Sequence, residues 1–119
     1  MRQATKGFPS TGYASLQSQM VRAAESIVFN IAEGCGAGTQ REFARFLGIS
    51  IKSSFELEAE AELARDYGVL SAAAWNDLYN RLVSVRRMLF ALHKKVLLSP
   101  RAAHLHLQPA TISREPPTS

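Results

Sequence analysis

Apolar residues recur along the chain in three stretches with the spacing of amphipathic helices. In the first stretch the intervals are mostly three and four residues, which places the apolar side chains on one helical stripe. In the second and third stretches the intervals alternate between three and four, which is a heptad pattern. The stretches cover residues 16–31, 43–64 and 75–96.

Capping signals give the expected ends of these helices. Gly34 and Gly68 stand where the first and second helix are expected to stop. Thr39 and Ser71 are favourable N-caps, and Glu42 follows Thr39 at the spacing of a capping box. The connectors are short, so consecutive helices should be antiparallel neighbours. We therefore predict an all-α, up-and-down helical bundle of the four-helix-bundle type.

The chain divides into three predicted segments. Residues 1–13 are polar with two glycines and a proline, which predicts an N-terminal loop. Residues 14–99 form the helical bundle domain. Residues 100–119 contain four prolines and little periodicity, which predicts a disordered C-terminal tail.

Composition favours a small cytoplasmic protein. The 119 residues fit one domain, and 46% of them are apolar, enough to form a core. The single cysteine excludes an internal disulfide. No apolar run approaches the ~20 residues that span a bilayer, and Met1 to Ser10 lack the apolar stretch of a signal peptide. We expect no membrane association.

Apolar side chains outside the main stripes predict a homo-oligomer. Ile51 and Phe55 lie one turn apart beside the heptad seam of the second helix, and Phe29 lies on the polar face of the first. Three helices also make a thin core for one subunit. Scattered surface apolar residues are common, but two extra apolar faces favour an oligomer interface at these three residues.

The placement of charge is more informative than the net charge of +4, which is ordinary for a small domain. The first half of the second helix is mainly basic and its second half mainly acidic, whereas the third helix becomes basic toward its end. Antiparallel packing brings the two basic halves together, which predicts a nucleic-acid-binding surface. Its residues are Arg41, Arg45, Lys52, Arg86, Arg87, Lys94 and Lys95.

Candidate catalytic and metal-binding groups are few. The glycines at positions 34, 36 and 38 follow a helix and lack a P-loop lysine, so a tight turn is favoured over a phosphate site at the next helix start. Cys35 has no histidine near it in sequence, and His93, His104 and His106 lack partners that would complete a zinc site. We expect no enzyme activity, no metal and no cofactor.

Asn30 and Glu33 are poorly suited to the last turn of a helix. One interpretation is a polar site formed with nearby arginines. The favoured interpretation is structural, with both side chains fixing the connector and the helix register.

Several strings in the chain resemble one protein family. They are Phe8-Pro9, Gln19, Arg22-Ala23-Ala24, Ser26-Ile27, Asn30-Ile31-Ala32-Glu33-Gly34, Glu42-Phe43, Arg45-Phe46-Leu47, Ile49, Ser53, Glu56-Leu57-Glu58, Gly68 and Leu70-Ser71. The family is that of the four helix bundle proteins, also called 23S rRNA intervening-sequence proteins. The resemblance covers roughly residues 8 to 98.

This resemblance implies a four-helix bundle and a pentameric ring. Retroelement accessory variability proteins are distantly similar, which implies a partner reverse transcriptase and a basic surface for nucleic acid. The chain departs from the family at Lys52, where a small residue is usual. It also begins almost at the Phe-Pro loop, whereas members usually have an amphipathic helix before it. We therefore expect that helix to be encoded upstream or replaced.

Two functions follow as hypotheses from these observations. The first is a non-enzymatic accessory subunit that binds RNA or DNA through phosphate contacts, with little sequence preference. The alternative is a scaffold that binds other proteins through Phe29, Ile51 and Phe55 without nucleic acid.

Overall fold

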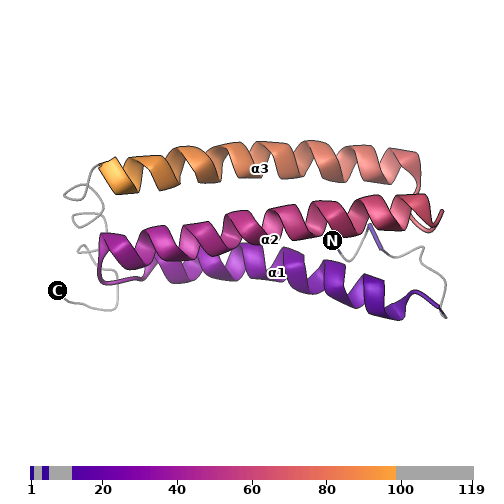
Figure 1. The fold of residues 1–119 in the computed structure, drawn as a ribbon, viewed down its shortest axis with the longest axis horizontal. Coiled ribbons are helices and arrows are strands. Elements are labelled where there is room, and N and C mark those ends of the chain that lie inside the picture. Colours follow the sequence, from indigo (N-terminus) through magenta and orange to yellow (C-terminus); the bar gives the residue numbers. More distant parts are fainter. Residues whose placement is uncertain (2–3, 6–11, 99–119) are drawn as a thin grey trace.

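The computed structural model describes residues 1, 4–5 and 12–98, and its regular structure consists of helices (Figure 1). Helix α1 covers Ala14–Cys35, α2 covers Gln40–Asp66 and α3 covers Ala72–Leu98. No strand occurs among the described residues. The prediction of an all-helical fold with two short connectors is confirmed.

Helix α2 is the centre of the arrangement. Both α1 and α3 pack along it, whereas α1 and α3 barely meet. The result is elongated, 50 × 25 × 17 Å, with a radius of gyration of 16.9 Å, against ~13 Å for a compact domain of ~100 residues. The described residues contain three helices, so the fourth helix of the predicted bundle is not among them.

Two predicted segments fall largely outside the described residues. These are the disordered tail over residues 100–119 and most of the N-terminal loop over residues 1–13. Of the latter, Thr5 is fully buried, and its hydroxyl accepts a hydrogen bond from Gln17 Nε2 at 3.3 Å. Met1 and Ala4 pack against the core. This part of the N-terminal segment therefore contributes to the packed structure.

The N-caps are those that the sequence predicts. Thr39 Oγ1 accepts a hydrogen bond from the Glu42 amide at 3.1 Å, and Ser71 Oγ accepts one from the Ala74 amide at 3.1 Å. After α2, Gly68 adopts a left-handed φ of 77°, a conformation that glycine adopts at little cost. The turn returns the chain so that Leu70 is buried at 3% exposure.

Gly34 has a different role from the predicted helix stop. It lies inside α1, which continues to Cys35. A Cβ atom at this position would lie 2.9 Å from Phe43 Cδ1 and 3.2 Å from Phe46 Cβ. Glycine is therefore required because the start of α2 packs directly on the backbone of α1.

Hydroxyl groups connect α1 to α2. Ser50 Oγ donates a hydrogen bond to the carbonyl oxygen of Ile27 at 2.8 Å, and the hydroxyls of Ser26 and Ser53 lie 2.8 Å apart. Asn30 Nδ2 donates to the Ser26 carbonyl oxygen at 2.8 Å. Asn30 Nδ2 also donates to Ser26 Oγ at 3.1 Å, so Asn30 bonds within α1 beside the Ser26–Ser53 contact. Glu33 is exposed, so it is not part of this polar contact.

Two glycines within helices give a stability prediction. Gly34→Ala should lower the free energy of unfolding, because crowding against Phe43 costs ~1–3 kcal/mol and exceeds the helix-propensity gain of up to ~1 kcal/mol. Gly48→Ala should raise it by ~0.5–1 kcal/mol, since nothing lies within 4 Å of a Cβ there. Urea unfolding of both variants measures the difference. A rise in midpoint for both would contradict the close packing at Gly34.

Candidate nucleic-acid interface

Side-chain contacts fix the register between α2 and α3. Arg86 Nε donates a hydrogen bond to Ser54 Oγ at 3.0 Å, and the guanidinium carbon of Arg65 lies 4.1 Å from the centroid of the Trp75 ring. The helices run in opposite directions side by side (Figure 1). Position 54 is therefore level with position 86, and position 65 with position 75. By the same register, positions 45 and 52 are level with positions 95 and 88, within one residue of Lys94 and Arg87.

This register aligns four of the predicted basic residues. Arg45 and Lys52 stand seven residues apart on α2, as do Arg87 and Lys94 on α3, and all four are exposed. Seven residues are two helical turns, or about 10.5 Å along each axis. Packed helix axes lie ~8–10 Å apart. We call these four residues the basic array, a rectangle of cations across two helices.

Helical periodicity places the basic array on one side of the helix pair. On α2, Arg45 and Lys52 lie opposite the core residues Phe43 and Leu57. On α3, Arg86 faces α2, and Arg87 lies about 100° further round the helix. Lys94, seven residues after Arg87, lies on the same side of α3 as Arg87. Asp77 is the only acidic residue of α3, so no carboxylate of that helix neutralises the array.

The array surrounds an exposed aromatic ring. Phe90 lies between Arg87 and Lys94, three residues after the first and four before the second, and it is 50% exposed. On α2, Gly48 lies three residues after Arg45 and four before Lys52, and no atom lies within 4 Å of where its Cβ would be. Phe90 is thus half exposed between two cations of its own helix, and α2 has no side chain at position 48 between the other two.

Arg86 is committed to contacts within the subunit. Its side chain is 13% exposed, and Nη2 donates to Glu58 Oε1 at 2.6 Å. The guanidinium carbon lies 3.9 Å from the centroid of the Phe55 ring. A cation held in this way has little left to offer a phosphate, so the structure gives Arg86 a packing role in place of the predicted phosphate contact.

The other predicted basic residues lie beside the array. Arg41 is exposed in the first turn of α2, and Lys95 is exposed in the last turn of α3.

Within the array, Arg45 donates from Nε to Glu42 Oε1 at 2.9 Å, but its side chain remains 56% exposed. Surface pairs of this kind are weak, so Glu42 holds Arg45 less firmly than Glu58 holds the largely buried Arg86.

The predicted oligomer-interface residues differ in exposure. Phe29 is 65% exposed and Phe55 is 49% exposed. Ile51 is only 8% exposed, because the packing of α2 with its neighbours covers it. The prediction that Ile51 belongs to an exposed apolar face is therefore corrected: it is part of the core of this subunit.

The acidic half of α2 contains an unfavourably placed carboxylate. Burial and the neighbouring carboxylate of Glu56 raise the pKa of Glu60, and the guanidinium of Arg22 opposes this shift. Among the described residues, Glu60 Oε1 is the one buried side-chain oxygen or nitrogen without a hydrogen-bond partner. This half of the helix thus repels anions, in contrast to the half that holds the array.

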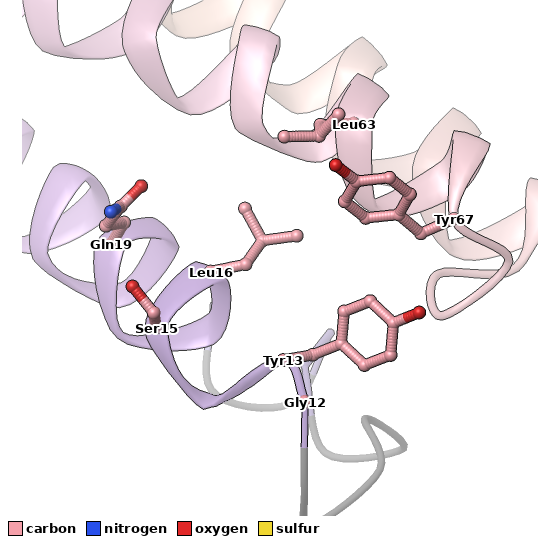
Figure 2. Close-up of a pocket in the computed structure, with 7 residues that line it drawn as sticks. All are labelled: Gly12, Tyr13, Ser15, Leu16, Gln19, Leu63 and Tyr67. Atoms are coloured by element: carbon pink, nitrogen blue, oxygen red, sulfur yellow. The ribbon is translucent and has the colours of Figure 1, made fainter.

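A shallow groove lies between the start of α1 and the end of α2 (Figure 2). The rings of Tyr13 and Tyr67 approach to 5.7 Å between centroids, and Leu16, Leu63 and Gln19 complete most of the lining. Figure 2 shows that the groove is open. It holds no charged residue, so it offers no acid–base pair for catalysis.

Other candidate chemistry remains isolated in the described part of the chain. Cys35 is exposed at the end of α1. No group of three or more metal-ligating side chains occurs there, and no described helix is long and apolar enough to cross a membrane. His104 and His106 lie outside the described residues.

Sequence reasoning missed Phe90 and Gly48. Neither residue is among the site residues that the sequence predicts. The signal was present in the spacing: Arg45, Gly48 and Lys52 are separated by three and four residues, as are Arg87, Phe90 and Lys94. Recognising it required the register between α2 and α3.

Glu60 gives a prediction about pH. Its pKa is raised in the folded state, so ionised Glu60 disfavours folding and this group adds stability as pH falls through the folded pKa. Glu60→Gln should therefore raise the urea midpoint at pH 7, and the gain should shrink as pH approaches the ordinary glutamate value of ~4.3. Glu62→Gln, at an exposed position of the same helix, is the control and should change little. An equal gain at both pH values would contradict this assignment.

Comparisons with known proteins place the chain in a family. Searches among curated proteins and among solved structures found no match. The family described as 23S rRNA-intervening sequence protein matches residues 1–91, which include α1, α2 and most of α3. The match agrees with the resemblance carried by the motifs of α1 and α2, and the chain belongs to the 23S rRNA-intervening sequence protein family.

Proposed function

We propose that this protein is a non-enzymatic subunit that binds RNA or DNA through phosphate contacts to the basic array. The observation that carries the proposal is the alignment of Arg45, Lys52, Arg87 and Lys94 on one side of α2 and α3. Cations that meet phosphates release condensed counterions, which favours binding without sequence recognition. The family description links its members to intervening sequences of 23S rRNA, which fits a role beside nucleic acid.

The distribution of charge supports this assignment over general solubility. Helix dipoles account for Lys94 and Lys95 near the end of α3, where cations are favourable. They do not account for Arg41 and Arg45 in the first turns of α2, where cations are unfavourable. An anionic partner gives these arginines a function that helix stability does not.

Salt-dependent affinity provides the test. With four phosphates engaged, log affinity should fall with log salt at a slope of roughly −3 to −4, measured by fluorescence anisotropy with labelled oligonucleotides. Arg87→Glu should weaken binding and flatten the slope. Arg81→Glu is the matched control, because Arg81 is exposed on the same helix but pairs with Asp77 in the first half of α3, away from the array. This variant should change the affinity and the salt slope far less.

Two results would argue against nucleic-acid binding. One is the absence of binding at low salt, and the other is an equal loss from Arg87→Glu and Arg81→Glu. Either result would favour the alternative, a scaffold for other proteins.

The proposal includes a homo-oligomer, with a pentamer suggested by the family resemblance. Large apolar residues are exposed on α1 and α3, among them Phe29 and Met88, each 65% exposed. In addition, α1 and α3 flank α2 without closing on each other. Helices from neighbouring subunits would cover these apolar side chains and complete a four-helix bundle.

Sedimentation equilibrium tests the oligomer. The protein should sediment as more than one subunit at micromolar concentration, and Phe29→Asp should shift it toward the monomer by placing a charge in the apolar contact. Ser18→Asp is the control for the added charge, since Ser18 is an exposed polar residue about three helical turns earlier on the same side of α1; it should leave the mass unchanged. A stable wild-type monomer would contradict the proposal.

A further inference from the structure

The site on α2 and α3 combines two features that duplex binding alone does not require. Its four cations lie at the corners of the basic array, and the Phe90 ring is exposed between them. On α2, Gly48 adds no side chain between Arg45 and Lys52, and nothing lies within 4 Å of where its Cβ would be. An exposed phenylalanine among arginines and lysines gains nothing from phosphates, so its position calls for an apolar or aromatic contact from the same ligand.

We propose that the basic array with Phe90 binds a single-stranded polynucleotide, with one base stacked on the Phe90 ring and the flanking phosphates on the four cations. This inference rests on the proposed function and narrows its ligand. Single strands present the faces of their bases to a protein, whereas a duplex stacks them inside. Binding of single strands commonly combines a positive groove with an aromatic platform in this way.

The geometry around Phe90 suits such a ligand. The cations of each helix stand about 10.5 Å apart along the axis, with Phe90 between them and half of its surface accessible. A strand that crosses from one pair of cations to the other passes over the ring. Stacking tolerates every base because each has an aromatic face, so the site should show little sequence preference.

Other aromatic side chains of the described chain do not share this arrangement. Phe55 is covered on one face by the guanidinium of Arg86, at 3.9 Å from the ring centroid. Trp75 and Tyr79 stack on each other with centroids 5.1 Å apart, in the acidic half. Phe29 is exposed on α1, away from the array. Phe90 therefore stands out as an accessible ring flanked by the exposed cations Arg87 and Lys94.

The test compares strands and duplexes. Anisotropy titrations of the whole chain would use three labelled oligonucleotides: an RNA strand of about 12 nucleotides, the DNA strand of the same sequence and the corresponding DNA duplex. This length should be enough to cross the array, because comparable single-strand sites bind ~4–16 nucleotides. Both single strands should bind more tightly than the duplex. Phe90→Leu should weaken single-strand binding roughly 5- to 150-fold, the equivalent of ~1–3 kcal/mol for one stacked base, and should leave duplex binding unchanged.

Two further variants separate stacking from a structural effect. Phe90→Trp should retain single-strand affinity, and the added indole fluorescence should be quenched by the strand but not by the duplex. Tyr67→Leu replaces another exposed ring, 55% exposed just after α2 and far from the array, with an apolar side chain, so it should leave all affinities unchanged. Because Phe90 is half exposed, Phe90→Leu should also retain the wild-type unfolding midpoint.

The outcomes distinguish this inference from the proposed function. If strand and duplex bind equally well and Phe90→Leu has no effect, the stacking site is overturned. The proposed function stands in that case if binding still depends on salt and Arg87→Glu still weakens it. Absence of binding to all three oligonucleotides would overturn both. A loss of affinity in Phe90→Leu that is equal for strand and duplex would also contradict stacking.

Discussion

The arrangement depends on the close approach of two helices to α2 at once. Ser50, Ser53 and Ser54 are buried on α2, where larger side chains would hold its neighbours away. A buried hydroxyl is costly without a hydrogen bond. Ser50 and Ser53 bond to α1, whereas Ser54 bonds to Arg86 of α3. The small residues allow the approach, and their hydroxyls select one register for each helix pair.

That register gives two adjacent arginines different roles. Arg86 faces α2, where Ser54 and Glu58 satisfy its guanidinium, and removing one partner of such a pair would leave the other poorly solvated. Arg87 lies one residue further, rotated by about 100°, and is exposed. The packing bond at Arg86 thus orients the face of α3 that carries part of the array, because it fixes where Arg87, Phe90 and Lys94 project.

Patterns within single helices could be predicted from the sequence, and contacts between helices could not. Periodicity and capping residues gave the helices and the caps at Thr39 and Ser71, because these depend on local spacing. The burial of Ile51, the packing role of Gly34 and the pairing of Arg86 with Glu58 depend on what the neighbouring helix presents. Four cations of the array were predicted to cluster, but their alignment and the ring between them required the register.

Two arginines near the start of α2, Arg45 of the array and Arg41 beside it, are unfavourable for the isolated helix. Arg41 and Arg45 lie near the positive end of the α2 dipole, where a carboxylate would be more favourable. Glu42 partly offsets this cost through its contact with Arg45 at 2.9 Å, although an exposed pair contributes little. The dipole and the arginines therefore add to one positive field at this end of α2. Such a field is unfavourable for the isolated helix and favourable for a bound anion, which is the combination expected of a binding surface.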